Sequence, residues 1–450
     1  MSQSHVTAAC SFAEGAYHVF DIAVVIGRFQ PLHQGHEALV KRALALGRQV
    51  AVLVGSAHQA PTPRNPFSFS ERAAMLKASA PASDRQRLHP LPLRDYYNVE
   101  RWAQAAVRAV GTLGAPARDA GAPAVLPAPE PAPALLASVA TANGPGEAPS
   151  VVLVGHVKDA SADYRDIFPA WAHDHVDALT LASEATESEP SKAKHDPPLA
   201  ASTALHPSEA GSIARRIDAT WIRQHLIGAA PSLAQGAVTP EQVLAPLTGV
   251  CSDKVLNLVA PWLVTDAFHN VAAEAQALRA YKDAWAQAPY APVFVTTDVL
   301  VTSASHVLLV SRGHAPGRGL LALPGGFLEQ GERLFASALR ELAEETGLHL
   351  STAIARRCLV ASHVFDHPHR SQRGRTVTHV FHLALDETAH QELGAPPSGL
   401  PTVAAGDDAA EAWWCPKRDL LGLEPRFFED HFMVLDHFLS LLDGDKATPI

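Results

Sequence analysis

The chain has 450 residues, of which 47% are hydrophobic and 18% charged, and its formal net charge is −10 at pH 7. This composition is ordinary for a globular protein, so it excludes wholesale disorder, and the acidic balance argues against a general nucleic-acid-binding protein. Because the sequence has no apolar run of the roughly 20 residues that a membrane helix needs, no signal-peptide pattern and no cysteine pairs of a disulfide or zinc framework, we expect a cytoplasmic protein.

Strand and helix patterns alternate over the first 230 residues. Apolar runs at 22–26, 50–54 and 151–154 are typical of buried strands, and helical spacing of apolar residues is found at 37–46, 71–78 and 99–110. This order predicts an α/β domain over residues 21–230, after a tail at 1–20, with a parallel sheet covered on both faces. Ligands of such sheets bind at the carboxyl ends of strands, which here are followed by residues 27–36 and 55–65.

The remaining segments differ in composition and in the spacing of their apolar residues. Two segments rich in proline and small residues, about 112–149 and 183–211, are predicted to be disordered insertions in the first domain. Amphipathic patterns predict a helical connector over 231–288. Strand patterns at 293–297, 307–310 and 378–385, with one strong helix at 334–346, then predict an α+β domain over 289–450.

The motif Gly27-Arg-Phe-Gln-Pro-Leu-His-Gln-Gly-His36 follows the first predicted strand and opens a helix. Gly27 and Gly35 allow the backbone to approach a ligand closely, and the helix N-terminus offers free N–H groups to phosphate. His33 and His36 are three residues apart, so both imidazoles can donate to phosphate oxygens. A single histidine here would more often be a helix cap or a surface residue, but the whole string favours phosphate handling.

This string resembles the H-x-G-H signature of the nucleotidyltransferase superfamily, and its Gly-Arg-Phe-Gln-Pro form is similar to archaeal-type nicotinamide-mononucleotide adenylyltransferases. The family's later elements occur in order at 55–57, 65–67, 71–76 and 220–223, and 155–161 with 168–171 resembles a bacterial bifunctional adenylyltransferase–hydrolase subgroup. Asp218 stands where a serine is common. The resemblance implies a Rossmann-like fold and adenylyl transfer from ATP to nicotinamide mononucleotide, with Mg²⁺ on the triphosphate.

The resemblance also implies a set of site residues. His33, His36 and Arg223 would be catalytic. The residues expected to bind ATP and its phosphates are Gly27, Arg28, Phe29, Gln30, Gly35, Arg72 and Thr220. Trp102 would stack on the nicotinamide ring, with Asp95 and Asn98 as polar partners, although Trp102 equally fits a plain core tryptophan on an amphipathic helix.

Three glutamates share one face of the predicted helix at 334–346. Glu341, Glu344 and Glu345 have the spacing i, i+3, i+4, so their like charges repel one another. A divalent cation would relieve the repulsion, and carboxylate oxygens suit Mg²⁺ or Mn²⁺. A solvated acidic face is the plain alternative, but a glycine-rich loop at 323–326 and a stop at Gly347 frame the helix.

The pattern from Gly326 to Leu348 is similar to the Nudix box at every specified position. Its residues are Gly326, Glu332, Arg340, Glu341, Glu344, Glu345 and Gly347. The resemblance implies metal-assisted hydrolysis of a diphosphate linked to a nucleoside, with Mg²⁺ as cofactor or Mn²⁺ in its place. Glu341 and Glu345 would be the first metal ligands and Glu344 a further one. Arg340 is expected to hold a glutamate of the box, such as Glu332, by an ion pair.

The segment 365–379, with 406–409 and 413–414, resembles the ADP-ribose-hydrolysing branch linked to NAD metabolism. Arg370, Arg373 and Arg375 would bind phosphate or be merely solvated. Asp407 and Asp408 would add an acidic group near the metal or form a turn.

These features predict a bifunctional enzyme, a nucleotidyltransferase and Nudix pyrophosphohydrolase. One domain would make NAD and pyrophosphate from nicotinamide mononucleotide and ATP, and the other would hydrolyse ADP-ribose to AMP and ribose 5-phosphate. The alternatives are a second domain that acts on another nucleoside diphosphate or senses a ligand, and a first domain that activates another phosphorylated metabolite. The expected partners are these small molecules, and we expect no binding to nucleic acid or membrane. The sequence does not decide between nicotinamide and nicotinic acid mononucleotide as substrate, and a homo-oligomer is possible.

Overall fold

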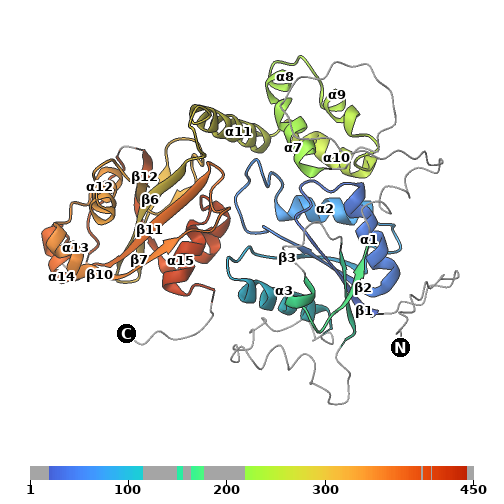
Figure 1. Ribbon diagram of the computed structural model, residues 1–450, viewed down its shortest axis with the longest axis horizontal. Helices are drawn as coiled ribbons and strands as arrows, with labels where there is room; N and C mark the ends of the chain where they lie inside the picture. The colour runs from blue at the N-terminus through green and yellow to red at the C-terminus, as the bar shows by residue number, and fades with distance from the viewer. Residues whose placement is uncertain are drawn as a thin grey trace, which may run out of the picture.

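A computed structural model describes residues 20–114, 149–155, 164–176, 218–396, 399–406 and 408–442. The predicted tail and the two predicted insertions lie outside these residues, apart from a few positions at their edges. Most of the 155–161 element and Asp407 lie outside them as well. Figure 1 shows two folded domains, which we call the first domain (residues 20–284) and the second domain (residues 293–442).

The first domain contains a five-stranded parallel sheet in the order β3-β2-β1-β4-β5. The strands are β1 (Phe20–Gly27), β2 (Gly47–Val54), β3 (Leu88–Pro92), β4 (Val151–Gly155) and β5 (Ala172–His175). The helices between them are α1 (Gln34–Leu46), α2 (Phe69–Ser79), α3 (Val99–Gly114) and the short α5 (Tyr164–Ile167). This order confirms the predicted parallel sheet, and α3 extends a few residues into the predicted first insertion.

Both faces of this sheet are buried, because successive strand residues point to opposite sides. Ala23 and Val25 of β1 join an apolar cluster with α1 and α2, whereas Ile22 and Val24 join a cluster with α3. Figure 1 shows α1 and α2 on one side of the strands and α3 on the other. The arrangement leaves the loops after β1, β2 and β3 together at one edge of the sheet.

The segment predicted as a connector is helical, but most of it packs into the first domain. It contains α8 (Ala230–Ala234), α9 (Pro240–Leu244), the 3-10 helix η1 (Ala245–Leu247), α10 (Asp253–Trp262) and α11 (Asp266–Ala284), after α7 (Ala219–Gly228). Val255, Val259 and Phe268 are buried in the same cluster as β1 and α1. The last helix, α11, then reaches the second domain, where the Glu274 carboxylate accepts the N–H of Gly317 at 2.8 and 2.9 Å.

The second domain is built on a seven-stranded mixed sheet in the order β10-β11-β6-β7-β12, with β8 beside β7 and β9 beside β6. The strands are β6 (Val293–Ser303), β7 (His306–Arg312), β8 (Leu321–Ala322), β9 (Gly325–Phe327), β10 (Leu359–Phe365), β11 (Arg375–Ala384) and β12 (Ala409–Pro416). The helices are α12 (Leu334–Thr346), α13 (Thr352–Cys358), α14 (Glu387–Glu392), the 3-10 helix η2 (Lys417–Arg426) and α15 (His431–Leu439). The predicted α+β domain is therefore confirmed.

Helix α12 has the bounds that the sequence predicts. It ends at Gly347, whose φ of 71° lies in the left-handed region that glycine adopts without a Cβ penalty. Its buried residues pack on one face of the sheet with Val299 and Val301, while α15 covers the other face beside Leu300. Among the described helices, none is long and apolar enough to cross a membrane.

Candidate functional site

The loop after β1 brings two histidines together at the carboxyl edge of the first sheet. Phe29 has a φ of 54° and a ring that is 1% exposed, so the loop turns sharply over a fixed anchor. His33 is the N-cap residue of α1, and His36 lies in the first turn. Their rings stack with centroids 3.7 Å apart, and the His36 ring also lies 4.9 Å from that of Phe29. The predicted imidazole pair is therefore assembled at a helix N-terminus.

Gln30 is not placed as a phosphate ligand, and this corrects the expectation from the motif. Its side chain is 2% exposed, and its amide exchanges two hydrogen bonds of 2.9 Å with the backbone of Phe67. A buried amide satisfied in this way fixes one loop against another. Gln30 thus holds the loop after β1 to the start of α2.

Arg72 also has a different surrounding from the one expected of a phosphate ligand. Its guanidinium is buried and donates to the carbonyls of Ser68, Arg28, Gly55 and Ser56 at 2.6–3.1 Å. Burial lowers the pKa of Arg72 to about 10. Because four of its N–H donors are already occupied by backbone, Arg72 connects the loops after β1 and β2 rather than facing the solvent.

The residues predicted on the nicotinamide side follow β3. The Asp95 carboxylate accepts from the backbone N–H and the hydroxyl of Ser56, at 3.1 and 2.5 Å. Asn98 caps α3 by accepting the N–H of Arg101 at 2.8 Å. Trp102 is half-buried and packs on the apolar cluster of α3, with ring centroids 5.8 Å from Phe168. Asp95 and Asn98 therefore shape the loop that ends at this edge.

Helix α7 completes the first site. Arg223 donates to the carbonyl of Gln30 at 2.8 Å and to the Thr220 hydroxyl at 3.2 Å, so residues 193 positions apart meet at the loop after β1. Burial, and after it the charges of Arg28 and Arg64, lower the pKa of Arg223. The guanidiniums of Arg28, Arg64 and Arg223 are thus close enough to interact electrostatically. Sequence reasoning missed Arg64, although it lies inside the 55–65 region that the strand order indicates.

The second site lies between α12 and the glycine loop of β9. The N–H of Gly325 donates to Glu345 at 3.0 Å, and a Cβ built on Gly326 would stand 2.4 Å from the Glu341 carboxylate. A side chain at position 326 would displace the Glu341 carboxylate from its present position, which is a reason for the glycine that opens the box pattern.

Arg340 holds the glutamates of the box, as the sequence predicts. Its guanidinium bonds both oxygens of Glu332 at 3.1 Å and also reaches Glu341 at 2.9 Å and Glu344 at 2.8 Å. The hydrogen bond of Glu332 is the main cause of the raised pKa of Arg340. Glu344 is the most exposed of the three helix glutamates, with 43% of its side chain accessible.

The pair of Glu341 and Glu345 is the part of this cluster suited to a cation. Burial raises the pKa of Glu345 to about 8, the N–H of Gly325 opposes the shift, and the charge of Glu341 adds to it. The described residues contain no group of three or more His, Cys, Asp or Glu side chains arranged to hold a metal ion. The two carboxylates fit a hard divalent cation by their oxygen chemistry, with further ligands from substrate or water.

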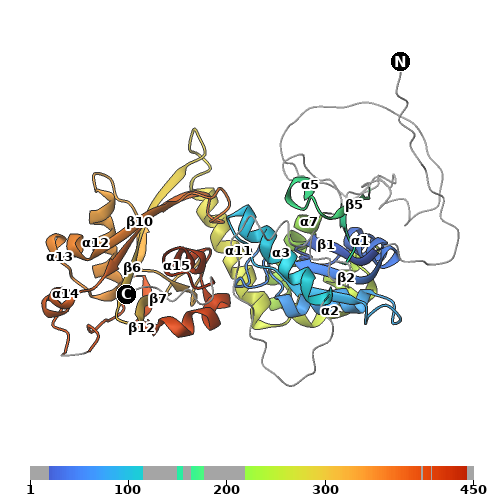
Figure 2. The same ribbon diagram turned by 90° about the horizontal axis from the view of Figure 1, so that it is seen from below.

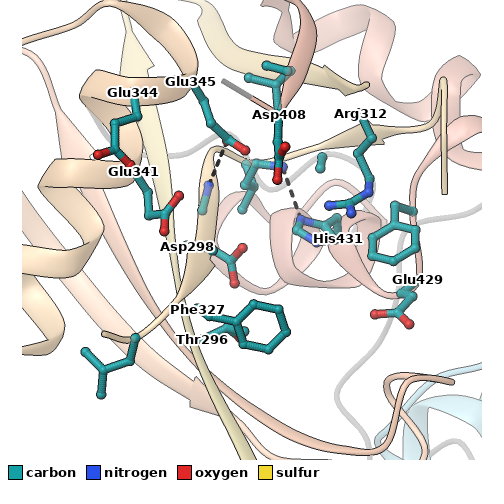
Figure 3. A pocket seen from close by; sticks show the side chains of 18 of the residues that line it. Thr296, Asp298, Arg312, Phe327, Glu341, Glu344, Glu345, Asp408, Glu429 and His431 are labelled. Atoms are coloured by element: carbon teal, nitrogen blue, oxygen red, sulfur yellow. Dashed lines mark hydrogen bonds between the residues drawn. The ribbon is translucent and has the colours of Figure 1, made fainter. Parts of the chain in front are cut away.

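A cavity of about 680 Å³ opens beside these glutamates. Figure 3 shows Glu341, Glu344 and Glu345 on one side, and Arg312, His431 and Glu429 on the other. The Arg312 guanidinium lies 4.4 Å from the ring centroid of Phe428 and faces the cavity. The cavity is therefore lined by carboxylates on one wall, and on the opposite wall by the Arg312 guanidinium together with the Glu429 carboxylate and the His431 imidazole.

Arg370, Arg373 and Arg375, which from the sequence would either bind phosphate or be solvated, have different surroundings. Arg370 is buried in a two-bond ion pair with Asp430, at 2.8 and 2.9 Å. Arg375 donates to the carbonyl of Asp366. Arg373 lines the cavity, with its guanidinium 5.2 Å from the ring of Phe327 and 5.7 Å from that of Phe428. Asp408 lines the cavity too, but its side chain is 73% exposed.

Sequence reasoning missed several residues of this cavity. Asp298 of β6 is buried, accepts the hydroxyl of Thr378 and has a pKa raised by burial. His431 accepts the N–H of Leu323 at 3.1 Å, and burial lowers its pKa to about 3, so it is neutral. Glu429 and Arg312 belong to no motif of the sequence, and both line the cavity.

Two family models match separate parts of the chain. Residues 24–101 match the cytidylyltransferase-like family, and residues 293–438 match the NUDIX domain. A nicotinamide/nicotinic acid mononucleotide adenylyltransferase of Acinetobacter baylyi is 29% identical over 167 residues, which are 37% of this chain and 72% of the relative.

The second domain has a relative of its own. An ADP-ribose pyrophosphatase of Methanocaldococcus jannaschii is 30% identical over 150 residues, which are 33% of this chain and 75% of the relative. A solved structure is similar to nearly the whole chain. It is the crystal structure of a bifunctional NMN adenylyltransferase/ADP ribose pyrophosphatase from Francisella tularensis, complexed with AMP and a manganese ion. Its sequence is 26% identical, the TM-score is 0.66, and the alignment covers 94% of this chain and 99% of the Francisella chain. The chain therefore belongs to the Nudix family through its second domain, which it joins to a cytidylyltransferase-like first domain.

Proposed function

We propose that this chain catalyses two reactions of NAD metabolism. The first domain transfers the adenylyl group of ATP to nicotinamide mononucleotide, giving NAD and pyrophosphate, and the second hydrolyses ADP-ribose to AMP and ribose 5-phosphate. The observation that carries the proposal is the likeness of nearly the whole chain to the bifunctional Francisella protein, together with two separate sites built for phosphate groups.

Adenylyl transfer needs positioning and charge neutralisation rather than a covalent residue. The phosphate of the mononucleotide attacks the α-phosphorus of ATP, one P–O bond forms, and pyrophosphate leaves. In our proposal His33 and His36 donate to the ATP phosphates, while Arg223 supplies fixed positive charge beside them. The neighbouring Arg28 and Arg64 add to that charge. Gln30 and Arg72 act indirectly, since they hold the loops that carry these groups.

Hydrolysis of ADP-ribose requires the opposite arrangement, in which acidic groups hold a cation. Glu341 and Glu345 would hold Mg²⁺ or Mn²⁺, with Glu344 close by. Such a cation, when bound, would polarise a phosphoryl oxygen and lower the pKa of the attacking water. In our proposal Arg312 and Arg373, which also line the cavity, bind the diphosphate. The exposed ring of Phe327, next to Arg373, would offer a flat surface for the nucleoside.

A product assay tests both halves of the proposal. The full chain is incubated with Mg²⁺, ATP and either nicotinamide or nicotinic acid mononucleotide, and separately with Mg²⁺ and ADP-ribose or NAD. Mass spectrometry should detect a dinucleotide with pyrophosphate in the first reaction, and AMP with ribose 5-phosphate from ADP-ribose in the second. Absence of dinucleotide with both mononucleotides would refute the first activity, and intact ADP-ribose would refute the second.

Arg312→Ala should weaken substrate binding in the second domain. Loss of a charge-assisted hydrogen bond to the diphosphate should raise the KM for ADP-ribose by about 10- to 100-fold and change kcat little. Initial rates over a range of ADP-ribose concentrations measure both constants. Arg356→Ala is a matched control, because Arg356 also lies over a phenylalanine ring, at 5.5 Å from Phe335, but outside the cavity. Equal KM values for the two variants would contradict the assigned role.

A further inference from the structure

The loop that follows β3 in the first domain contacts the second domain through charged side chains. Arg94 donates two hydrogen bonds of 2.5 Å to the Glu424 carboxylate of η2, and only 18% and 7% of these side chains are exposed. Arg101 forms a second ion pair, at 2.9 Å, with the buried Asp436 of α15. In both ribbon views α15 lies on the side of the second domain that faces the first (Figures 1 and 2). The contact is therefore a specific, largely desolvated one.

The same loop carries Asp95, the residue next to Arg94. Asp95 holds the backbone and hydroxyl of Ser56 in the loop after β2. The Ser56 carbonyl accepts from Arg72 at 3.1 Å, and Arg72 also bonds the carbonyl of Arg28 at 2.8 Å. A continuous chain of short polar contacts thus leads from the second domain to the loops around the first site.

Glu424 meets two of the three loops at this edge. Besides Arg94 after β3, His58 after β2 lies 3.8 Å from its carboxylate. Burial alone would lower the pKa of Arg94, but the hydrogen bonds and charge of Glu424 outweigh it and raise that pKa. A carboxylate with so little access to water is costly to leave unpaired, so it keeps Arg94 in one position.

We propose that Glu424 of the second domain is a positioning residue for adenylyl transfer in the first domain, because through Arg94 it fixes the loop that places Asp95. This inference rests on the proposed function of the first domain. In the proposed function Asp95 belongs to the mononucleotide side of the site, whereas the loop that carries the histidine pair is held through Gln30 by contacts within the first domain. Loss of Glu424 should therefore affect the mononucleotide more than ATP.

The test is steady-state kinetics of the full chain with Glu424→Gln, Arg94→Gln and the double variant. We expect the KM for nicotinamide mononucleotide to rise about tenfold in each single variant, a size typical of coupling between sites. The KM for ATP, the kcat of transfer and the hydrolysis of ADP-ribose should change less than about twofold. Because both residues act through one contact, the double variant should be no worse than the single ones.

Arg357→Gln is the matched control, since Arg357 forms a similar two-bond ion pair with Asp386 on the exposed surface of the second domain. Arg94→Lys keeps the charge without the two-pronged geometry, so it should raise the same KM about threefold, and it replaces Glu424→Gln if that variant does not fold. Thermal unfolding shows which variants are folded.

The possible results distinguish failure of the proposed function from failure of the role assigned to Glu424. A wild-type chain that forms no dinucleotide refutes the proposed function and this inference with it. An active wild type, with a folded Glu424→Gln or Arg94→Lys variant whose KM for the mononucleotide is unchanged, refutes the inference alone. The same holds if Arg357→Gln raises this KM as much, or if transfer and hydrolysis fall together.

Discussion

Glu345→Gln should reduce ADP-ribose hydrolysis by about a thousandfold and leave adenylyl transfer intact. The substitution keeps the size of the side chain and an acceptor for the N–H of Gly325, but it removes one of the two carboxylates proposed to hold the cation. Several kcal/mol of transition-state stabilisation depend on that cation, and about 4 kcal/mol corresponds to a thousandfold in rate. Release of AMP and formation of dinucleotide are measured on the same preparation.

Two comparisons distinguish a loss of catalysis in Glu345→Gln from a loss of folding. Glutamine also removes the repulsion with Glu341, so the temperature of unfolding should not fall. Glu392→Gln is the control, because Glu392 likewise accepts a backbone N–H, that of Ser351 at 2.6 Å, but lies in α14 away from the cavity. Full hydrolysis by Glu345→Gln would show that the cation is held elsewhere.

His36→Ala should have the reverse effect, with adenylyl transfer reduced by about 100- to 1,000-fold and hydrolysis unchanged. Removal of one donor aimed at developing charge typically has an effect of this size. The stacked geometry adds a reason, since the His36 ring also supports that of His33 at 3.7 Å. Dinucleotide formation at saturating ATP and mononucleotide measures the loss.

His269→Ala provides the comparison for this histidine. His269 lies in the same domain and contacts a phenylalanine ring, with centroids 5.5 Å apart, but its α11 position is remote from the loop after β1. We expect its transfer rate to equal that of the wild type. If His36→Ala abolished both activities in a folded chain, the two sites would not be independent.

The features that could be predicted from the sequence are those with a local cause. The bounds of α12 follow from apolar spacing and from Gly347, and the ion pair of Arg340 with Glu332 spans only eight residues. The parallel pairing of the strands in the first domain also follows from the alternation of strands and helices.

The features that could not be predicted depend on distant partners. Gln30 and Arg72 look like ligands within their motifs, yet each is occupied by backbone groups from another loop. Arg312 belongs to no motif, and at the cavity it contacts the ring of Phe428, which lies more than a hundred residues away in the sequence. Arg94 meets a partner 330 positions away. The spacing of residues along the sequence does not indicate such long-range pairs.

The packing of α9, α10 and α11 also determines where the molecule can be divided. A fragment that stops near residue 230 would lack Val255, Val259 and Phe268. It would expose to water the apolar surface of the first domain that these side chains cover, and we expect it to aggregate. A fragment that continues to Ala284 keeps that surface covered, but it uncovers the α11 face that bears Glu274. Protein engineers who want either half alone would therefore place the junction after α11 and replace the apolar side chain of Tyr281, which packs on Phe294.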